Sequence, residues 1–181
     1  MRDPRLQGLD KLTQAQRTMM LIARAGNVNR YHNELVRSQT VGHHSFGVAW
    51  FVVMLCHGEP PWYLLYAAIQ HDVAEAVVGD VPAPTKRVVP GLKDALDKYE
   101  DEVMASFGIA DPNLDDIEKR ILKFADIFEG MLYCCTERSM GNKNADGIFS
   151  NFRDYAAAME PSGIALELFH TLVELYTNVS E

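Results

Sequence analysis

Residues 62–78 read "WYLLYAAIQHDVAEAVV", a stretch in which only Gln70, His71, Asp72 and Glu75 are strongly polar. The other side chains are apolar nearly all round a helix, so the pattern predicts a buried helix over this range. A buried carboxylate is costly unless it is paired, and Asp72 therefore needs a cationic partner or a metal ion. Glu75 lies four residues after His71 and three after Asp72, so all three side chains can face one pocket.

Helical spacing of apolar residues extends through most of the chain, whereas the alternation typical of strands is scarce. We therefore expect an all-α fold, a single-domain bundle of six or seven helices over residues 1–181. The segment 80–91, "DVPAPTKRVVPG", holds three prolines, and we expect a loop there rather than a continuous helix. The expected helices cover about 13–25, 43–57, 62–78, 92–107, a stretch that begins near 113 or 114, 147–158 and 163–178.

Composition restricts the partners and the compartment. A length of 181 residues with 48% hydrophobic content suits one domain with a real core. Seventeen Lys and Arg against 25 Asp and Glu give a net charge of -8, so no nucleic-acid polymer is expected as a partner. Three cysteines without a CxxC pair, a polar start "MRDPRLQGLD" and no membrane-length apolar run predict a cytoplasmic protein without a membrane partner.

Two further stretches place polar residues among apolar ones. In "RILKFADIFEG", Asp126 looks buried, and in "TVGHHSFGVAWFVVML" two histidines open the most apolar expected helix. Spacing does not choose between His43 and His44. Taken singly, such a histidine is more often a cap or a packed core residue, and Asp126 could pair with Arg120 on the surface. Taken with His71 and Asp72, however, these residues supply two imidazoles and two carboxylates, a set that suits a first-row divalent ion.

The order H…HD…D on separate helices resembles the HD-domain metal-dependent phosphohydrolases, and the match covers most of the chain. Three stretches, "RYHNELVRSQTVGHHSFGVA", "HDVAEAVVGDVPAPTK" and "FADIFEGMLYCCTE", look like the branch of the bacterial 5'-deoxynucleotidases and the small phage deoxynucleoside triphosphate (dATP) triphosphohydrolases. The pattern HDxxExxxGDxPxPxK is the most specific part. Its matching residues are His71, Asp72, Glu75, Gly79, Asp80, Pro82, Pro84 and Lys86.

The resemblance implies roles for individual residues. It places the first ligand histidine directly before Ser45, which selects His44. The implied metal ligands are His44, His71, Asp72 and Asp126. The implied catalytic residues are Glu75, as the acid or base that handles the attacking water, and Asp80, which assists catalysis or binds substrate. The implied substrate contacts are Arg30, Tyr31, Pro82 and Lys86.

Some of these positions carry an alternative or depart from the branch. Pro82 either packs on the base or sugar or only shapes its loop. Tyr31 stands where the branch usually has a Trp that helps to exclude a ribose 2'-hydroxyl, and Ile127 replaces a common Lys. The expected cofactor is one tightly held divalent ion (Co, Mn, Fe, Ni or Zn), with a second, weaker ion such as Mg left open.

We expect metal-dependent hydrolysis of 2'-deoxyribonucleotides at the α-phosphorus. The favoured reaction is that of a 5'-deoxynucleotidase, which converts a deoxynucleoside monophosphate to deoxynucleoside and phosphate. The alternative is a triphosphohydrolase that releases triphosphate from a dNTP such as dATP, for which Lys86, Arg87 and Arg37 are possible β- and γ-phosphate contacts. Less favoured are a signalling nucleotide such as ppGpp as substrate and a non-catalytic, metal-stabilised helical scaffold. A homo-oligomer is expected, with a small-molecule deoxynucleotide as substrate.

Overall fold

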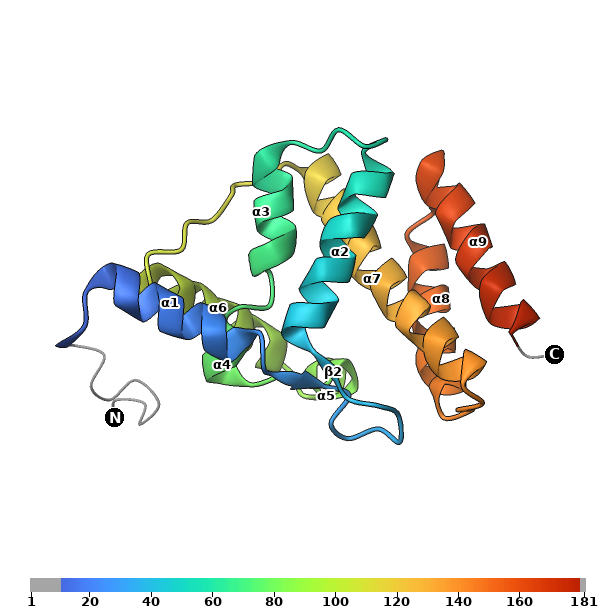
Figure 1. Ribbon diagram of the computed structural model, residues 1–181, viewed down its shortest axis with the longest axis horizontal. Helices are drawn as coiled ribbons and strands as arrows, with labels where there is room; N and C mark the ends of the chain where they lie inside the picture. The colour runs from blue at the N-terminus through green and yellow to red at the C-terminus, as the bar shows by residue number, and fades with distance from the viewer. Residues whose placement is uncertain (1–10, 180–181) are drawn as a thin grey trace.

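Helices α2 (Val41–Leu55) and α7 (Asp116–Ser139) lie side by side through the middle of the protein (Figure 1). The structure, a computed structural model, describes residues 11–179, and there it is helical apart from turns and one pair of two-residue strands. The all-α helical fold is therefore confirmed. Residues 1–10, for which the sequence predicted no export leader, and residues 180–181 lie outside the described range.

The remaining elements flank this central pair. They are α1 (Gln14–Ala25), β1 (Asn29–Arg30), β2 (Gln39–Thr40), α3 (Trp62–Gln70), α4 (Glu75–Val78), α5 (Ala83–Val88), α6 (Leu92–Ser106), α8 (Ala145–Ala158) and α9 (Ile164–Asn178). Most expected helices are present with ends that differ by a few residues. Among the helices of residues 11–179, none combines the length and apolar character needed to cross a bilayer.

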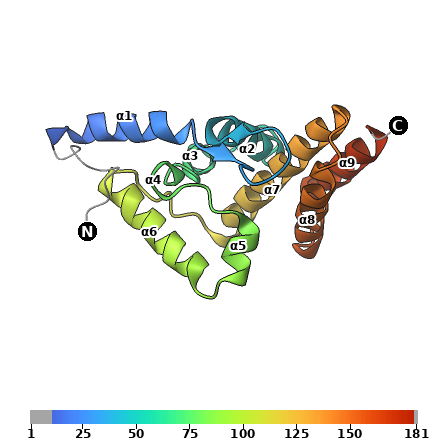
Figure 2. The same cartoon turned by 90° about the horizontal axis from the view of Figure 1, so that it is seen from below.

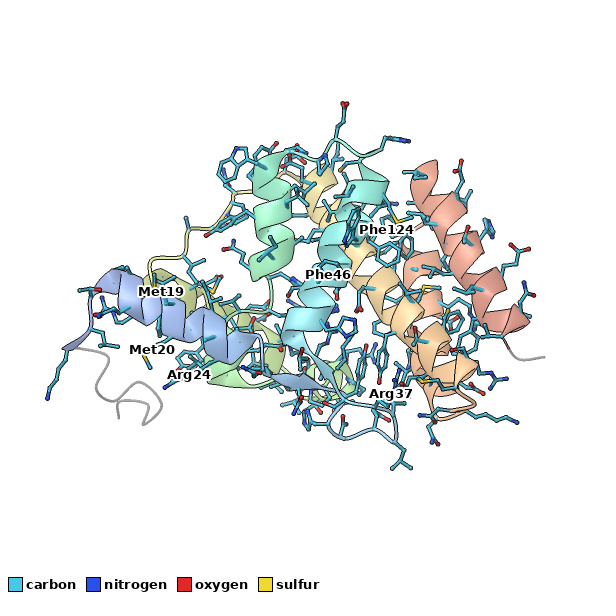
Figure 3. The ribbon with its side chains drawn as sticks, in the orientation of Figure 1. Met19, Met20, Arg24, Arg37, Phe46 and Phe124 are labelled. Carbon is cyan, nitrogen blue, oxygen red and sulfur yellow. The ribbon has the colours of Figure 1, made fainter. Side chains whose placement is uncertain are left out.

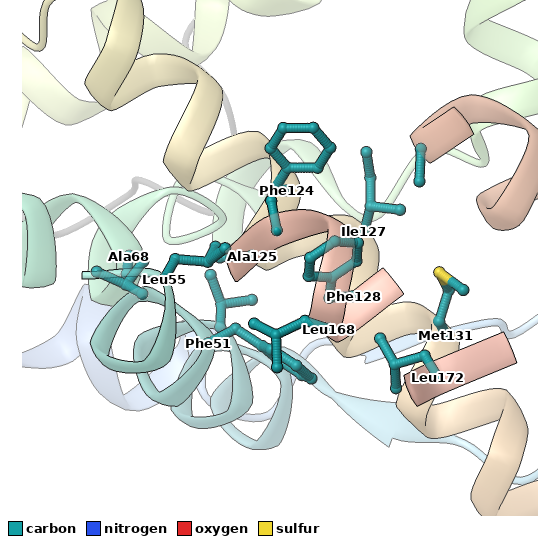
Figure 4. Close-up of a cluster of buried hydrophobic side chains, with 14 of the residues drawn as sticks. Phe51, Leu55, Ala68, Phe124, Ala125, Ile127, Phe128, Met131, Leu168 and Leu172 are labelled. Carbon is teal, nitrogen blue, oxygen red and sulfur yellow. The ribbon is translucent and has the colours of Figure 1, made fainter. Parts of the chain in front are cut away.

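The larger core lies where α2 and α7 meet α3, α8 and α9. Phe51 of α2 and Phe124 of α7 both pack against Phe128, with ring centroids 5.9 and 5.5 Å apart. Leu168 and Leu172 extend this cluster from α9 (Figure 4). Burial of this apolar surface supplies the main favourable term in folding, and it fixes α2 and α7 relative to each other.

A second, smaller core lies under α1. Leu21 and Ala25 of α1 meet Val73 and Val77 near α4 and Val103 of α6. Figure 2 shows α4 between α1 and α6 on this side of the molecule. The short segment between α3 and α4 therefore connects the two cores, and it contains His71 and Asp72.

The prediction of one continuous helix over 62–78 is wrong. Helix α3 ends at Gln70, residues 71–74 form turns, and α4 starts at Glu75. The amide of Val73 bonds the carbonyl of Gln70 at 2.9 Å, a tighter pattern than the α-helical one. In an α-helix, consecutive side chains diverge by about 100°. In the tighter turn at residues 71–74, the spacing of the His71 and Asp72 side chains differs from this α-helical one.

One other local expectation also needs correction. Helix α5 forms within the proline-rich segment expected to be a loop, because Pro82 precedes it and Pro84 occupies its first turn, where a missing N–H costs nothing. Strands β1 and β2 pair antiparallel within the long polar segment after α1, with Arg30 opposite Gln39. The divided helix and the added α5 explain why the structure exceeds the expected six or seven helices.

Gly130 of α7 packs tightly against Phe152 of α8. A Cβ built at this position would lie 2.6 Å from the ring of Phe152. We expect Gly130→Ala to lower the free energy of unfolding by about 1–3 kcal/mol, as overpacking does in cores. Chemical denaturation measures this change, and Gly147→Ala in α8 is the matched control, because a Cβ there meets nothing within 4 Å. Equal effects of the two substitutions would contradict the steric explanation.

Candidate metal centre and active site

Three side chains from distant parts of the chain converge on one point. His44 comes from the first turn of α2, His71 from the turn after α3, and Asp126 from the middle of α7. The Nε2 atoms of the two histidines are 3.2 Å apart, and Oδ1 of Asp126 is 3.3 Å from Nε2 of His44. One ligand atom from each residue lies within 4.8 Å of the others, a spacing that permits a shared metal ion.

The hydrogen bonds of the two imidazoles show that this cluster suits a cation. Nδ1 of His71 lies 2.9 Å from the carbonyl oxygen of Ala68, and Nδ1 of His44 contacts the carboxylate of Glu129. Both partners only accept, so each Nδ1 carries a proton, and each Nε2 is the nitrogen left to bind a metal ion. Burial opposes a charge on His44, but the hydrogen bonds that it donates to the carboxylates of Asp126 and Glu129 raise its pKa to about 9. A proton therefore supplies the positive charge that a divalent ion would bring.

Asp72 lies next to the cluster but is not one of the three residues, His44, His71 and Asp126, whose ligand atoms lie within 4.8 Å of one another. Its Oδ2 is 3.4 Å from Nε2 of His71 and 3.6 Å from Nε2 of His44. The same oxygen is 3.6 Å from Nη1 of Arg30. Burial opposes ionisation, but His71 and Arg30 keep the pKa of Asp72 below its ordinary value. Asp72 is thus an ionised carboxylate between the histidines and a cation, and its role as a fourth ligand stays a prediction.

Asp126 is also held in its charged form. Nζ of Lys123 donates to Oδ2 of Asp126 at 2.7 Å, which leaves Oδ1 toward His44. Burial opposes ionisation, yet Lys123 and His44 hold the pKa of Asp126 well below its ordinary value. Sequence reasoning missed Lys123. Its position one turn before Asp126 on the same helix was the available signal.

Glu75 is the acidic residue beside this cluster. It begins α4, is buried, and its Oε2 has no hydrogen-bond partner among the described residues. Burial, together with the carboxylates of Asp72 and Asp80, raises the pKa of Glu75 to about 9. An acid that holds its proton at neutral pH and has a free oxygen can exchange a proton with a nearby water molecule.

The expected substrate residues lie on the strand β1, the loop after it and the segment around α5. Nη1 of Arg30 is buried and, apart from its ion pair with Asp72, makes no hydrogen bond to a described residue. Tyr31 has a left-handed backbone, with φ of 57°, and its ring stacks on Tyr133 at a centroid distance of 4.6 Å. Asp80 approaches His32, with Oδ2 3.7 Å from Nδ1.

Pro82 and Lys86 belong to the same segment as Asp80. Pro82 directly precedes α5, and Lys86 lies in the last turn of that helix, where both side chains are half-buried. Lys86 is close enough to lower the pKa of Glu75 against the opposing effect of burial. The segment therefore brings a cation toward the candidate catalytic acid.

Arg37, a possible phosphate contact of the triphosphohydrolase alternative, is engaged elsewhere. Its Nε donates to Oε1 of Glu137 at 2.7 Å, and its backbone amide donates to Oε2 at 3.1 Å. Glu137 is only 1% exposed and also accepts from Asn142 at 2.8 Å. Figure 3 shows Arg37 near the C-terminal end of α7. The residue ties the loop after β1 to α7 and leaves one cation fewer for a substrate.

Glu129 is the main contact that sequence reasoning missed. Besides His44, it accepts a hydrogen bond from Nε2 of Gln39 at 2.6 Å. Both Glu129 and Gln39 are buried. The available signal was a carboxylate inside the apolar stretch "DIFEGM", one turn after Asp126.

Comparison with known families adds to this geometry. The sequence model described as 5'-deoxynucleotidase YfbR-like matches residues 12–108, which is more than half of the chain. The chain belongs to the YfbR-like family. The matched range includes Arg30, His44, the HD pair and the segment up to Lys86, whereas Asp126 lies beyond it.

This YfbR-like chain also has a curated relative and similar solved structures. Protein YfdR of Escherichia coli K12 is 32% identical over 101 residues, which is 56% of this chain and 49% of YfdR, so the chain spans about half the length of that relative. The cyanophage S-2L HD phosphohydrolase DatZ, described as bound to dA and one catalytic Zn²⁺, has a TM-score of 0.64 at 18% identity, covering 88% of this chain and 96% of DatZ. An HD-domain phosphohydrolase of Listeria innocua has a TM-score of 0.66 at 18% identity, over 92% and 98% of the two chains. At these identities the likeness shows the fold.

Proposed function

We propose that the protein is a divalent-metal-dependent phosphohydrolase that removes the 5'-phosphate from 2'-deoxynucleoside monophosphates. The observation that carries this proposal is the convergence of His44, His71 and Asp126 within 4.8 Å, with Asp72 alongside them. Membership of the YfbR-like family supports the substrate class. Because Asp126 lies outside the matched residues 12–108, the proposed catalytic unit extends into α7.

The residues around the cluster have different proposed roles in hydrolysis. A divalent ion held there would lower the pKa of a water molecule and draw charge from the phosphoryl oxygens. Glu75 would take up or release the proton of that water at Oε2, the oxygen that is free of hydrogen bonds. Arg30 would bind a phosphoryl oxygen through the buried Nη1, and Lys86 would add a second positive charge from α5.

The ion pair between Arg37 and Glu137 favours a monophosphate over a triphosphate as the substrate. A triphosphohydrolase needs positive charge beyond the α-phosphate, and the ion pair with Glu137 removes one of the cations that could supply it. The triphosphohydrolase reaction is kept as the second candidate because the α-phosphorus chemistry is common to both.

The proposal is tested with purified protein that has been stripped of metal and then supplied with Mn²⁺ or Co²⁺. We expect inorganic phosphate from deoxynucleoside monophosphates, and a panel of dNTPs assayed for triphosphate tests the second candidate. Ribonucleotides in the same panel show whether Tyr31 permits a 2'-hydroxyl. Failure to release phosphate or triphosphate from any nucleotide, with any metal, would overturn the proposed function.

Arg30 provides a prediction for substrate binding. We expect Arg30→Ala to raise KM by about tenfold to a hundredfold, because a hydrogen bond to a charged group contributes about 1.5–3 kcal/mol. Arg30→Lys should lie between this variant and wild type, because it keeps the charge but loses the planar fork. Steady-state kinetics measures both, and Arg153→Ala, an arginine that pairs with Asp154 on α8, is the control. An unchanged KM in Arg30→Ala would remove Arg30 from the substrate site.

A further inference from the structure

A buried series of hydrogen bonds runs outward from the cluster of His44, His71 and Asp126 through His44. Nδ1 of His44 contacts Oε2 of Glu129, and Oε1 of Glu129 accepts from Nε2 of Gln39 at 2.6 Å. The exposed fractions of Gln39, His44 and Glu129 are 3%, 0% and 4%. Each carboxylate oxygen therefore has a separate donor, and the side chain of Glu129 is fixed at both oxygens.

This arrangement determines which ring nitrogen of His44 faces the cluster. A carboxylate accepts from Nδ1–H, so the nitrogen of His44 left to bind a metal is Nε2, the atom that lies 3.3 Å from Asp126 and 3.2 Å from His71. A carboxylate behind an imidazole also makes it a stronger donor to a metal. His71 has only the backbone carbonyl of Ala68 in the corresponding position. The two histidines thus differ in their outer partners.

Helix α2 leaves space for this carboxylate. Gly47 lies three residues after His44, and a Cβ built there would be 2.6 Å from Cγ and 3.2 Å from Oε1 of Glu129. Since both oxygens of Glu129 are held, its Cγ cannot move away without breaking a hydrogen bond. Any larger residue at position 47 would displace the carboxylate.

The pairing of strands β1 and β2 links this series of hydrogen bonds to Arg30, the proposed phosphate-binding residue. Gln39 of β2 is the register partner of Arg30 of β1, and Thr40, the next residue, caps α2 by accepting from the amide of His43. The start of α2 is therefore fixed by a strand whose partner carries the proposed phosphate-binding arginine.

We propose that Glu129 is a positioning residue, oriented by Gln39 and accommodated by Gly47, that sets the tautomer and direction of His44 and, through its negative charge, strengthens His44 as a metal ligand. This inference rests on the proposed function, because it requires that the cluster holds an ion. A purely structural role, in which Glu129 and His44 only satisfy each other in the core, is the competing explanation. The two explanations differ in metal affinity.

The decisive variant is Glu129→Gln, which keeps the shape and removes the charge. Oε1 of Gln39 has no hydrogen-bond partner among the described residues, so its amide can turn over and accept from the new Gln. The metal-free protein is titrated with Mn²⁺ by calorimetry and with Co²⁺ by visible absorption. We expect the dissociation constant to rise about 10- to 100-fold in Glu129→Gln, with an altered Co²⁺ spectrum.

Further variants separate an effect on metal affinity from an effect on folding stability. Gln39→Ala and Gly47→Ala retain the carboxylate but disturb its orientation, and each should weaken metal binding less than Glu129→Gln. The matched control is Glu137→Gln, which alters another buried carboxylate of α7 that pairs with Arg37 rather than with the cluster. It should lower the melting temperature and leave metal affinity unchanged.

The outcomes separate this inference from the proposed function. Wild-type affinity in Glu129→Gln would overturn the positioning role even if the enzyme hydrolyses deoxynucleotides. Weakened metal binding in Glu129→Gln would support it even if no nucleotide is hydrolysed, in which case only the proposed function fails. Absence of metal binding in the wild type would overturn both.

Discussion

Replacing Glu75 with Gln is expected to lower kcat by about 10²- to 10⁴-fold, the range typical of a lost general acid or base. The residue is buried beside the cluster, and its Oε2 is without a hydrogen-bond partner among the described residues. Gln fills the same space but cannot exchange a proton. Metal content and KM should therefore stay close to wild type, and steady-state kinetics with elemental analysis measures all three quantities.

The same substitution should make the metal-free protein more stable. The pKa of Glu75 rises from an ordinary 4.5 to about 9, first because of burial and then because of Asp72 and Asp80. Between these two values the unfolded chain releases a proton that the folded protein retains, so the wild type loses stability as pH rises. Gln does not titrate. The melting temperature of Glu75→Gln should exceed that of wild type, by a margin that grows from pH 5 to pH 8.

Glu102→Gln, an exposed change on α6, controls for the loss of one negative charge. Full turnover in Glu75→Gln with bound metal would show that Glu75 is not the acid or base of the reaction. A fall in activity that follows a fall in metal content would instead indicate that Glu75 helps to hold the ion.

The sequence led to the candidate cluster because buried charge is costly. Asp72 and Asp126 were conspicuous as carboxylates inside apolar helices, and the cost of burying them unpaired led directly to a cation. The structure places His44, His71 and Asp126 around one point, as that argument requires. Their individual roles stay predictions until variants are measured.

The sequence could not predict the local backbone at the HD pair. Every residue from 62 to 78 is compatible with a helix, and no Gly or Pro marks the break before Gly79. The break depends on tertiary contacts, since α3 packs in the larger core and Val73 and Val77 pack in the smaller one. Such competition between two cores is invisible to the periodicity of one segment.

Hydrogen-bond partners of the site were equally hard to predict. Glu129 and Lys123 are on the same helix as Asp126, but only the crossing of α2 and α7 brings Glu129 to His44. Arg37 was ambiguous for a related reason, because its partner Glu137 is a hundred residues away in sequence. Pairings over such separations follow from the fold, and the sequence alone contains no local sign of them.

Replacing His44 with Ala is expected to remove metal binding, with at least a hundredfold loss of affinity, and to reduce hydrolysis to background. His44 is fully buried, and its Nε2 lies 3.2 Å from Nε2 of His71 and 3.3 Å from Oδ1 of Asp126. Its loss removes a ligand and leaves Glu129 without its imidazole partner. Calorimetric titration with Mn²⁺ measures the affinity, and phosphate release measures the activity.

The neighbouring His43 is the matched control for this change. It is exposed, lines a cavity of about 220 Å³ with Arg37 and Glu129, and is not one of the three clustered residues, so His43→Ala should bind metal and turn over like wild type. If His44→Ala folds poorly, His71→Ala tests the same cluster at a less enclosed position. A ligand that binds only the folded state at a thousand times its Kd adds about 4.1 kcal/mol of stability. Added Mn²⁺ should therefore raise the melting temperature of wild type and His43→Ala but not of His44→Ala, and equal shifts in all three would place the ion elsewhere.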